Sequence, residues 1–270
     1  AVPVVRTLLP AVQGEMPWRD LPMRLAALAR ALRHRPLATV ADALGPYDSL
    51  LRRHLPSSLT RAPVSAFAAH AGIGPSVPGG ALFAWWQAAY HLFGQWHARG
   101  GAQGLTDALV RRLDALGGEL RCGAPVAKVA ARDGRVRAVV TETGEYIETR
   151  AVITAMDPKT ALLNLLDPPL GERDRADITA ARRSNVVQAL VHVATDRLPP
   201  YPNARPGDWN GLQSFVDRLD DLVGAWAAAE ARLLPDAPPL YAFTTSAIDP
   251  TLAPPKHHTV YLACPAAPSR

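Results

Sequence analysis

The sequence predicts an α+β fold, with a mixed or mainly antiparallel sheet, helices on one face of it, and a small three-stranded β-meander lobe. Helical and strand-like patterns lie in separate stretches of the chain, and Asp133-Gly134 is a strong hairpin signal between two alternating patterns. The strands of the main sheet are expected near residues 186–194, 240–246 and 259–263.

Apolar residues at helical spacing predict the helices. Leu21 to Leu32 repeats apolar residues every three or four positions, and Asp20 and Pro22 stand where a cap and a first-turn proline belong. The segment 81–93 is apolar on nearly every side, which is typical of a helix that is buried or lines a cavity. The other expected helices cover residues 48–55, 103–116, 171–183 and 217–234.

The meander is predicted after a pair of glycines. Gly117-Gly118 ends the helix before it, as a left-handed cap would. The run 151–154 that follows it reads as a short buried strand, ended by Asp157-Pro158. The meander strands are expected over residues 125–132, 135–143 and 146–149.

Composition is that of an ordinary globular chain. Of 270 residues, 48% are hydrophobic and 20% charged, so a sizeable core can form. The net charge of +5 comes mostly from arginine, with basic groups at residues 30–35 and 52–54. Solvated helix faces explain these groups better than a nucleic-acid site, because no basic stripe with interleaved aromatics occurs. Peripheral contact with anionic lipid is an alternative.

The cysteines indicate the cellular compartment of the protein, and the first residue indicates how the chain arose. Cys122 and Cys264 form neither a Cys-x-x-Cys pair nor a metal spacing, so we expect no metal and a reducing, cytoplasmic setting. No apolar run is long enough to predict a spanning helix. Ala1 stands where a methionine would begin a chain, which predicts a trimmed, processed or cleaved product of a longer one.

Five blocks in order resemble phytoene-desaturase-like and monoamine-oxidase-like flavoproteins. They lie within roughly residues 79 to 263, and their order makes the resemblance more specific than any one block. The blocks are GGAQGLTDAL at 100–109, GELRCGAPVAKV at 118–129, DGRV at 133–136, AVITAMDP at 151–158, and DPTLAPP with HHTV over 249–260.

The resemblance implies a flavin adenine dinucleotide (FAD) cofactor and some of its contacts. The backbone of Val126 would lie against the adenine, and Ala155, Met156 and Asp157 would approach the ribose and pyrophosphate. Small residues permit such close approach. The alternative for Asp157, which we favour from the residues alone, is that it only ends a strand before Pro158.

The resemblance also implies a domain division and a missing part. Residues 118–158 would be the meander of an FAD-binding domain, and residues 1–117 and 159–270 a substrate-binding domain. The G-x-G-x-x-G fingerprint of such domains is absent, because Gly72-x-Gly74 is followed by proline and no glycine stands at position 77. We therefore expect a fragment that acts on an apolar substrate only with the missing segments. A stand-alone module that binds a hydrophobic ligand or caps a partner is the alternative.

Candidate substrate-lining residues come from the aromatic helix. The alternative for them is ordinary aromatic packing. His91 and His97 flank this segment, and a structural or surface role is favoured for both. No catalytic acid or base stands out, as expected where a flavin supplies the chemistry. The aromatic candidates are Trp85, Trp86, Tyr90 and Phe93.

Overall fold

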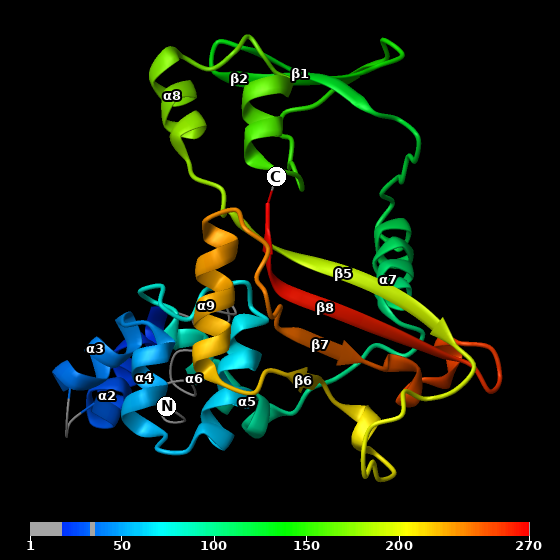
Figure 1. The fold of residues 1–270 in the computed structure, drawn as a ribbon. Coiled ribbons are helices and arrows are strands. Elements are labelled where there is room, and N and C mark those ends of the chain that lie inside the picture. Colours follow the sequence, from blue (N-terminus) through cyan, green and yellow to red (C-terminus); the bar gives the residue numbers. More distant parts are fainter. Residues whose placement is uncertain (1–17, 33–35, 270) are drawn as a thin grey trace. The chain divides into compact units, whose positions relative to one another are not determined.

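The computed structural model describes residues 18–32 and 36–269 and has the α+β class that the sequence predicts (Figure 1). Two compact units make up the chain: unit 1 is Ala1–Leu105 with Ser184–Arg270, and unit 2 is Thr106–Arg183. Each unit contains one four-stranded sheet. The domain division expected above depends on cofactor contacts rather than on compactness, and it stays a prediction.

The helices follow the apolar patterns closely, with α2 and α6 at the expected bounds. Their bounds are α2 (Leu21–Leu32), α3 (Pro36–Leu44), α4 (Tyr47–His54), α5 (Ser58–Ala69), α6 (Ala81–Phe93), α7 (Ala102–Ala115), α8 (Glu172–Ala180) and α9 (Leu219–Glu230).

Helix α5 was not expected, because proline usually ends a helix and Pro63 lies inside it. The Ser57 side chain caps the helix by accepting a hydrogen bond from the Leu59 backbone N–H. Proline removes the donor for the carbonyl four residues earlier, which is that of Leu59. Since Leu59 is 86% exposed, water can serve that carbonyl, and the helix continues.

The sheet of unit 1 has the strand order β5-β8-β7-β6, and every pairing in it is antiparallel (Figure 1). Its two long strands pair from Val186 opposite Pro268 to Thr195 opposite His258, with a bulge near Gln188. The sequence predicted three of the four strands and missed the short β6. The bounds are β5 (Val186–Thr195), β6 (Gln213–Phe215), β7 (Leu240–Phe243) and β8 (His258–Pro268).

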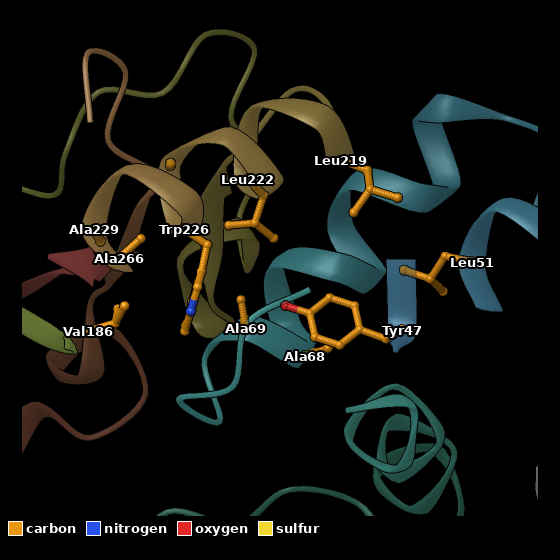
Figure 2. Close-up of a cluster of buried hydrophobic side chains, with 11 residues drawn as sticks. Tyr47, Leu51, Ala68, Ala69, Val186, Leu219, Leu222, Trp226, Ala229 and Ala266 are labelled. Carbon is orange, nitrogen blue, oxygen red and sulfur yellow. The ribbon is translucent and has the colours of Figure 1, made fainter. Parts of the chain in front are cut away.

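The main core of unit 1 lies where α9 meets α5 and the ends of β5 and β8 (Figure 2). Leu222 is fully buried there, and Trp226 is 5% exposed. The indole of Trp226 also explains Gly74, since a Cβ at that glycine would lie 2.6 Å from the indole Nε1. Gly74 thus leaves room for the Trp226 indole, a role that was not predicted from the sequence.

Unit 2 holds a mixed sheet with the strand order β3-β2-β1-β4. Asp133 and Gly134 both have positive φ, as the tight hairpin between β1 and β2 requires. The predicted meander is present, and β4 adds a fourth strand that runs parallel to β1. The bounds are β1 (Val126–Arg132), β2 (Arg135–Thr141), β3 (Tyr146–Glu148) and β4 (Leu166–Asp167).

The prediction of a short buried strand over 151–154 was wrong. That segment is irregular, and Ile153 is 95% exposed. A strand needs a neighbour for its N–H and C=O groups. No strand within residues 18–32 and 36–269 pairs with this segment.

The basic group at residues 52–54 is paired with carboxylates. Arg52 pairs with Asp220, and Arg53 pairs with Asp42. The Nε2 of His54 lies 3.0 Å from the same Asp42 carboxylate. Such pairing is what a solvated helix face predicts. Part of the other basic group, residues 33–35, lies outside the described residues. No helix of the described part is long and apolar enough to span a bilayer.

Substituting Leu222→Ala is expected to lower the free energy of unfolding by about 2–5 kcal/mol, because it removes buried methyl groups and leaves a cavity. Leu233→Ala, at a leucine that is 62% exposed, is the matched control and should change it by less than about 0.5 kcal/mol. Urea unfolding followed by tryptophan fluorescence measures both. Equal losses for the two variants would contradict the core assignment.

Candidate functional site

A cavity of about 720 Å³ opens on one face of the unit 1 sheet. The sheet residues that line it include His192 from β5, Phe243 from β7 and Tyr261 from β8. Tyr261 lies opposite both His192 and Phe243 in the strand pairing, so the three side chains share one face. We call these three residues the cavity floor. The size lies within the roughly 300–1,000 Å³ of ligand pockets.

Helix α5 covers the same sheet face next to the floor. Tyr241, two positions before Phe243 on β7, is fully buried, and its hydroxyl donates a 2.5 Å hydrogen bond to the Ala66 carbonyl of α5. Ala66, Tyr241 and Ala263 form a small buried cluster. Part of the face is therefore closed by the helix, and the cavity floor is a neighbouring part that the helix leaves open.

Two segments far apart in sequence meet beside the floor. The Asp249 carboxylate accepts a 2.6 Å hydrogen bond from the Gly100 backbone N–H. Leu252, in the 3₁₀ turn Pro250–Leu252, lies against Gly101, where an added Cβ would be 3.0 Å from its Cδ2. Gly101 has a φ of +76° and lines the cavity together with Leu252. The glycine pair and the DPT sequence thus build one wall.

Asp249 is held in its charged form. Its side chain accepts hydrogen bonds from the Thr251 hydroxyl at 2.6 Å and the Thr251 backbone N–H at 3.1 Å, in addition to the one from Gly100. The Thr251 hydroxyl is the largest cause, and the Gly100 N–H the next, of a pKa below the usual range for aspartate. The carboxylate lies 3.9 Å from Nε2 of His97, which also lines the cavity.

His70 is the third histidine at the cavity. It is the C-cap residue of α5, and its ring packs edge-on against Tyr241 with 5.6 Å between ring centroids. Burial lowers its pKa from the ordinary value for histidine. Partial burial of the ring thus favours the neutral form of the His70 imidazole.

The aromatic candidates of α6 lie elsewhere. Trp85 lines a second cavity of about 370 Å³, beside Leu50 and Leu55. Trp86 is 38% exposed, and Tyr90 packs edge-on against Phe67 with 5.2 Å between ring centroids. The Phe93 side chain lies outside the described residues, and His91 is exposed. None of the described candidates lines the larger cavity, and their substrate role stays a prediction.

The cavity floor was not predicted from the sequence. His192 stood in a strand pattern among valines, and Phe243 and Tyr261 read as ordinary strand residues. An alternation of side chains indicates a face, but only the pairing of β5, β7 and β8 shows which residues share it. His97 was singled out, with a structural or surface role favoured, and it lines the cavity.

The residues expected at a flavin nucleotide all belong to unit 2. Val126 begins β1, and Ala155 and Met156 are exposed in an irregular segment. Ala155 is a small residue, which permits close approach to the backbone and fits that part of FAD. Their cofactor role stays a prediction.

Asp157 is already engaged as a helix cap. Its Oδ2 accepts hydrogen bonds from the Thr160 N–H at 3.0 Å, the Thr160 hydroxyl at 3.1 Å and the Arg183 guanidinium at 2.7 Å. The Thr160 N–H is the largest cause of a lowered Asp157 pKa. Pro158 follows at the first helical position, where proline is favoured. Capping the helical turn that begins at Pro158 is thus a role that the structure shows for Asp157. The expectation that Asp157 ends a strand was wrong, because residues 151–154 form no strand, and ribose contact stays a prediction.

Neither cysteine is in a disulfide, and no group of three or more metal-binding side chains occurs among the described residues.

The chain belongs to the family described as flavin containing amine oxidoreductase, whose profile matches residues 45–265. This match confirms the resemblance drawn from the five sequence blocks. It covers the cavity floor, the wall at Gly101 and the meander together.

Curated relatives and a solved structure agree with the family. A 4,4'-diapolycopene oxygenase of Methylomonas sp is 27% identical over 165 residues, covering 61% of this chain and 31% of that protein. An all-trans-zeta-carotene desaturase of Myxococcus xanthus is 29% identical over 185 residues, covering 64% and 32%. An oxidoreductase from Methanosarcina mazei shares the fold, with a TM-score of 0.60 at 17% identity over 97% of this chain and 54% of that one. The chain spans about a third of the length of these curated relatives.

Asp249→Asn is expected to lower the stability of the chain at pH 7 and much less at pH 3. The folded state depresses the Asp249 pKa, so its contribution to stability is complete above the unfolded pKa of about 3.9 and is lost as pH falls through the lower folded value. In the variant, an amide nitrogen would also face the N–H donors of Gly100 or Thr251.

Urea unfolding at the two pH values measures the difference. Asp236→Asn, at an exposed aspartate, is the matched control. A stability difference between wild type and Asp249→Asn that is equal at pH 7 and pH 3 would sink the charge argument.

Proposed function

We propose that this chain is the substrate-binding part of a flavin-dependent oxidoreductase, and that the cavity over β5, β7 and β8 holds an apolar substrate. The single observation behind the proposal is the lining of that cavity. Apolar residues from several elements line the cavity beside the floor, among them Ala102, Ala194 and Leu252. An apolar wall contributes affinity by removing hydrocarbon surface from water.

The relatives support the choice of substrate class. Two of them are named for 4,4'-diapolycopene and for all-trans-zeta-carotene. We infer a carotenoid-like or other hydrophobic substrate for this chain from those names and from the cavity lining together. The floor contributes aromatic surface from Phe243 and Tyr261 on which an extended apolar molecule can lie.

The cofactor in this proposal is FAD, which when bound would accept a hydride or electrons from the substrate. The residues of this chain would position the substrate and keep water from it. Val126, Ala155 and Met156 would lie along the nucleotide, with Asp157 fixing the turn that presents them. Since the sequence has no G-x-G-x-x-G, we propose that this chain alone does not grip the flavin and is inactive without further segments.

A stand-alone binding module is the second candidate. The cavity is formed within unit 1 alone, so a ligand site does not depend on a flavin-binding part. In that case the chain would hold a hydrophobic ligand, or cap a partner, without chemistry.

Titration of the purified chain with FAD tests whether this chain alone binds the flavin. We expect no stoichiometric binding, because the phosphate-binding fingerprint is missing. Flavin fluorescence and visible absorbance report the titration. Tight binding at one FAD per chain would overturn the proposal that the grip lies outside this chain.

Filling the cavity is expected to abolish binding of an apolar probe. Diphenylhexatriene, a hydrocarbon polyene whose fluorescence rises in apolar sites, should bind the wild-type chain. Ala194→Trp places an indole in the cavity that Ala194 lines, and should weaken probe binding at least tenfold, a change of about 1.4 kcal/mol.

Val191→Trp is the matched control, because Val191 is exposed on the same strand but its side chain points to the other sheet face. Thermal unfolding of each variant shows whether the fold is kept. If both variants bind the probe like wild type, the cavity is not the ligand site.

A further inference from the structure

The cavity is not uniformly apolar. Three histidines line it from three separate elements: His70 from the end of α5, His97 from the segment before α7, and His192 from β5. A ligand made only of hydrocarbon would leave polar ring nitrogens facing apolar surface, which costs free energy. The protein groups that contact each imidazole determine which of the three histidines is available to bind a ligand.

His97 and His192 are directed toward protein groups. His97 faces the charged Asp249 carboxylate, 3.9 Å from its Nε2. The His192 ring packs against the Tyr261 ring, with 5.4 Å between centroids. Both rings thus have a protein neighbour that accounts for their placement.

His70 differs from both, because a side-chain hydrogen bond to one of its ring nitrogens defines which nitrogen carries the proton. The Gln188 side-chain nitrogen lies 3.3 Å from Nδ1 of His70. An amide NH₂ can only donate, so Nδ1 accepts and the proton of the neutral ring is on Nε2. Among the residues that the structure describes, Nε2 has no hydrogen-bond partner. Tyr241, against the ring, fixes its orientation.

We propose that the ligand of this cavity is an apolar molecule with an uncharged oxygen, such as a ketone, aldehyde or alcohol, that accepts a hydrogen bond from Nε2–H of His70. The inference rests on the proposed function and narrows its substrate class. The apolar lining binds the hydrocarbon part, and the imidazole fixes one end. A neutral donor recognises an oxygen without demanding a charge on the ligand.

The test compares two ligands of equal chain length, 2-undecanone and undecane, as competitors of bound diphenylhexatriene. The ketone oxygen can accept a hydrogen bond and cannot donate one, and undecane can do neither. We expect the ketone to bind the wild-type chain roughly three- to tenfold more tightly than undecane, the factor of one net hydrogen bond.

The variant His70→Phe removes the donor and keeps an aromatic ring beside Tyr241. It should abolish the preference for the ketone while the affinity for undecane stays unchanged. His257→Phe is the matched control, because His257 is exposed and does not line the cavity. It should keep the wild-type preference. Thermal unfolding of both variants reports on the fold.

The outcomes separate this inference from the proposed function. Equal binding of the two ligands by wild type, or a ketone preference that survives His70→Phe, overturns the inference and leaves an apolar site in place. Failure of diphenylhexatriene and both ligands to bind the wild-type chain overturns the proposed function, and the inference with it.

Discussion

The antiparallel pairing of β5 with β8 is the constraint on which the cavity depends. It extends from Val186 opposite Pro268 to Thr195 opposite His258, and so it joins the beginning and the end of the last third of the chain. Side chains alternate between faces along each strand, so a shift of one residue would put Val193 where His192 now lies. The buried cluster of Tyr241 under α5 opposes such a shift, because Ala263 of β8 packs within it.

A second link acts at the edge of the cavity, and it gives two family sequence blocks a structural meaning. The glycine pair at 100–101 and the segment beginning at Asp249 are about half a chain apart, yet one carboxylate joins them. Gly101 needs both its positive φ and the absence of a side chain, since Leu252 lies against it. The blocks are therefore understood as parts of a cavity wall, independently of any flavin contact.

Much of the fold could be predicted from local patterns. The bounds of α2 and α6, the Asp133-Gly134 hairpin and the long strands all follow from spacing and turn chemistry. Helix α5 was missed because it contains Pro63. The residue four positions earlier, Leu59, is exposed, and local sequence patterns do not report that exposure. The prediction of a strand over 151–154 was wrong because an apolar run becomes a strand only where a neighbouring strand pairs with it.

The site was harder to predict than the fold. Its residues lie at the end of α5, on β5, β7 and β8, and on two connecting segments. Strand pairing and the hydrogen bond between Gly100 and Asp249 bring them together. The aromatic helix α6 attracted attention because its composition is unusual, whereas the floor combines ordinary strand residues. Composition reports how apolar a segment is, and it contains no information on which distant segment it faces.

The contact between Gly74 and Trp226 has a consequence for how this sequence can vary. A methyl group at position 74 would lie 2.6 Å from the indole, inside a core where the tryptophan is 5% exposed and has little room to move. Amino-acid substitutions at positions 74 and 226 must therefore be correlated. Any descendant of this chain that gains a side chain at position 74 needs a smaller residue at position 226, and a tryptophan kept there forbids the change.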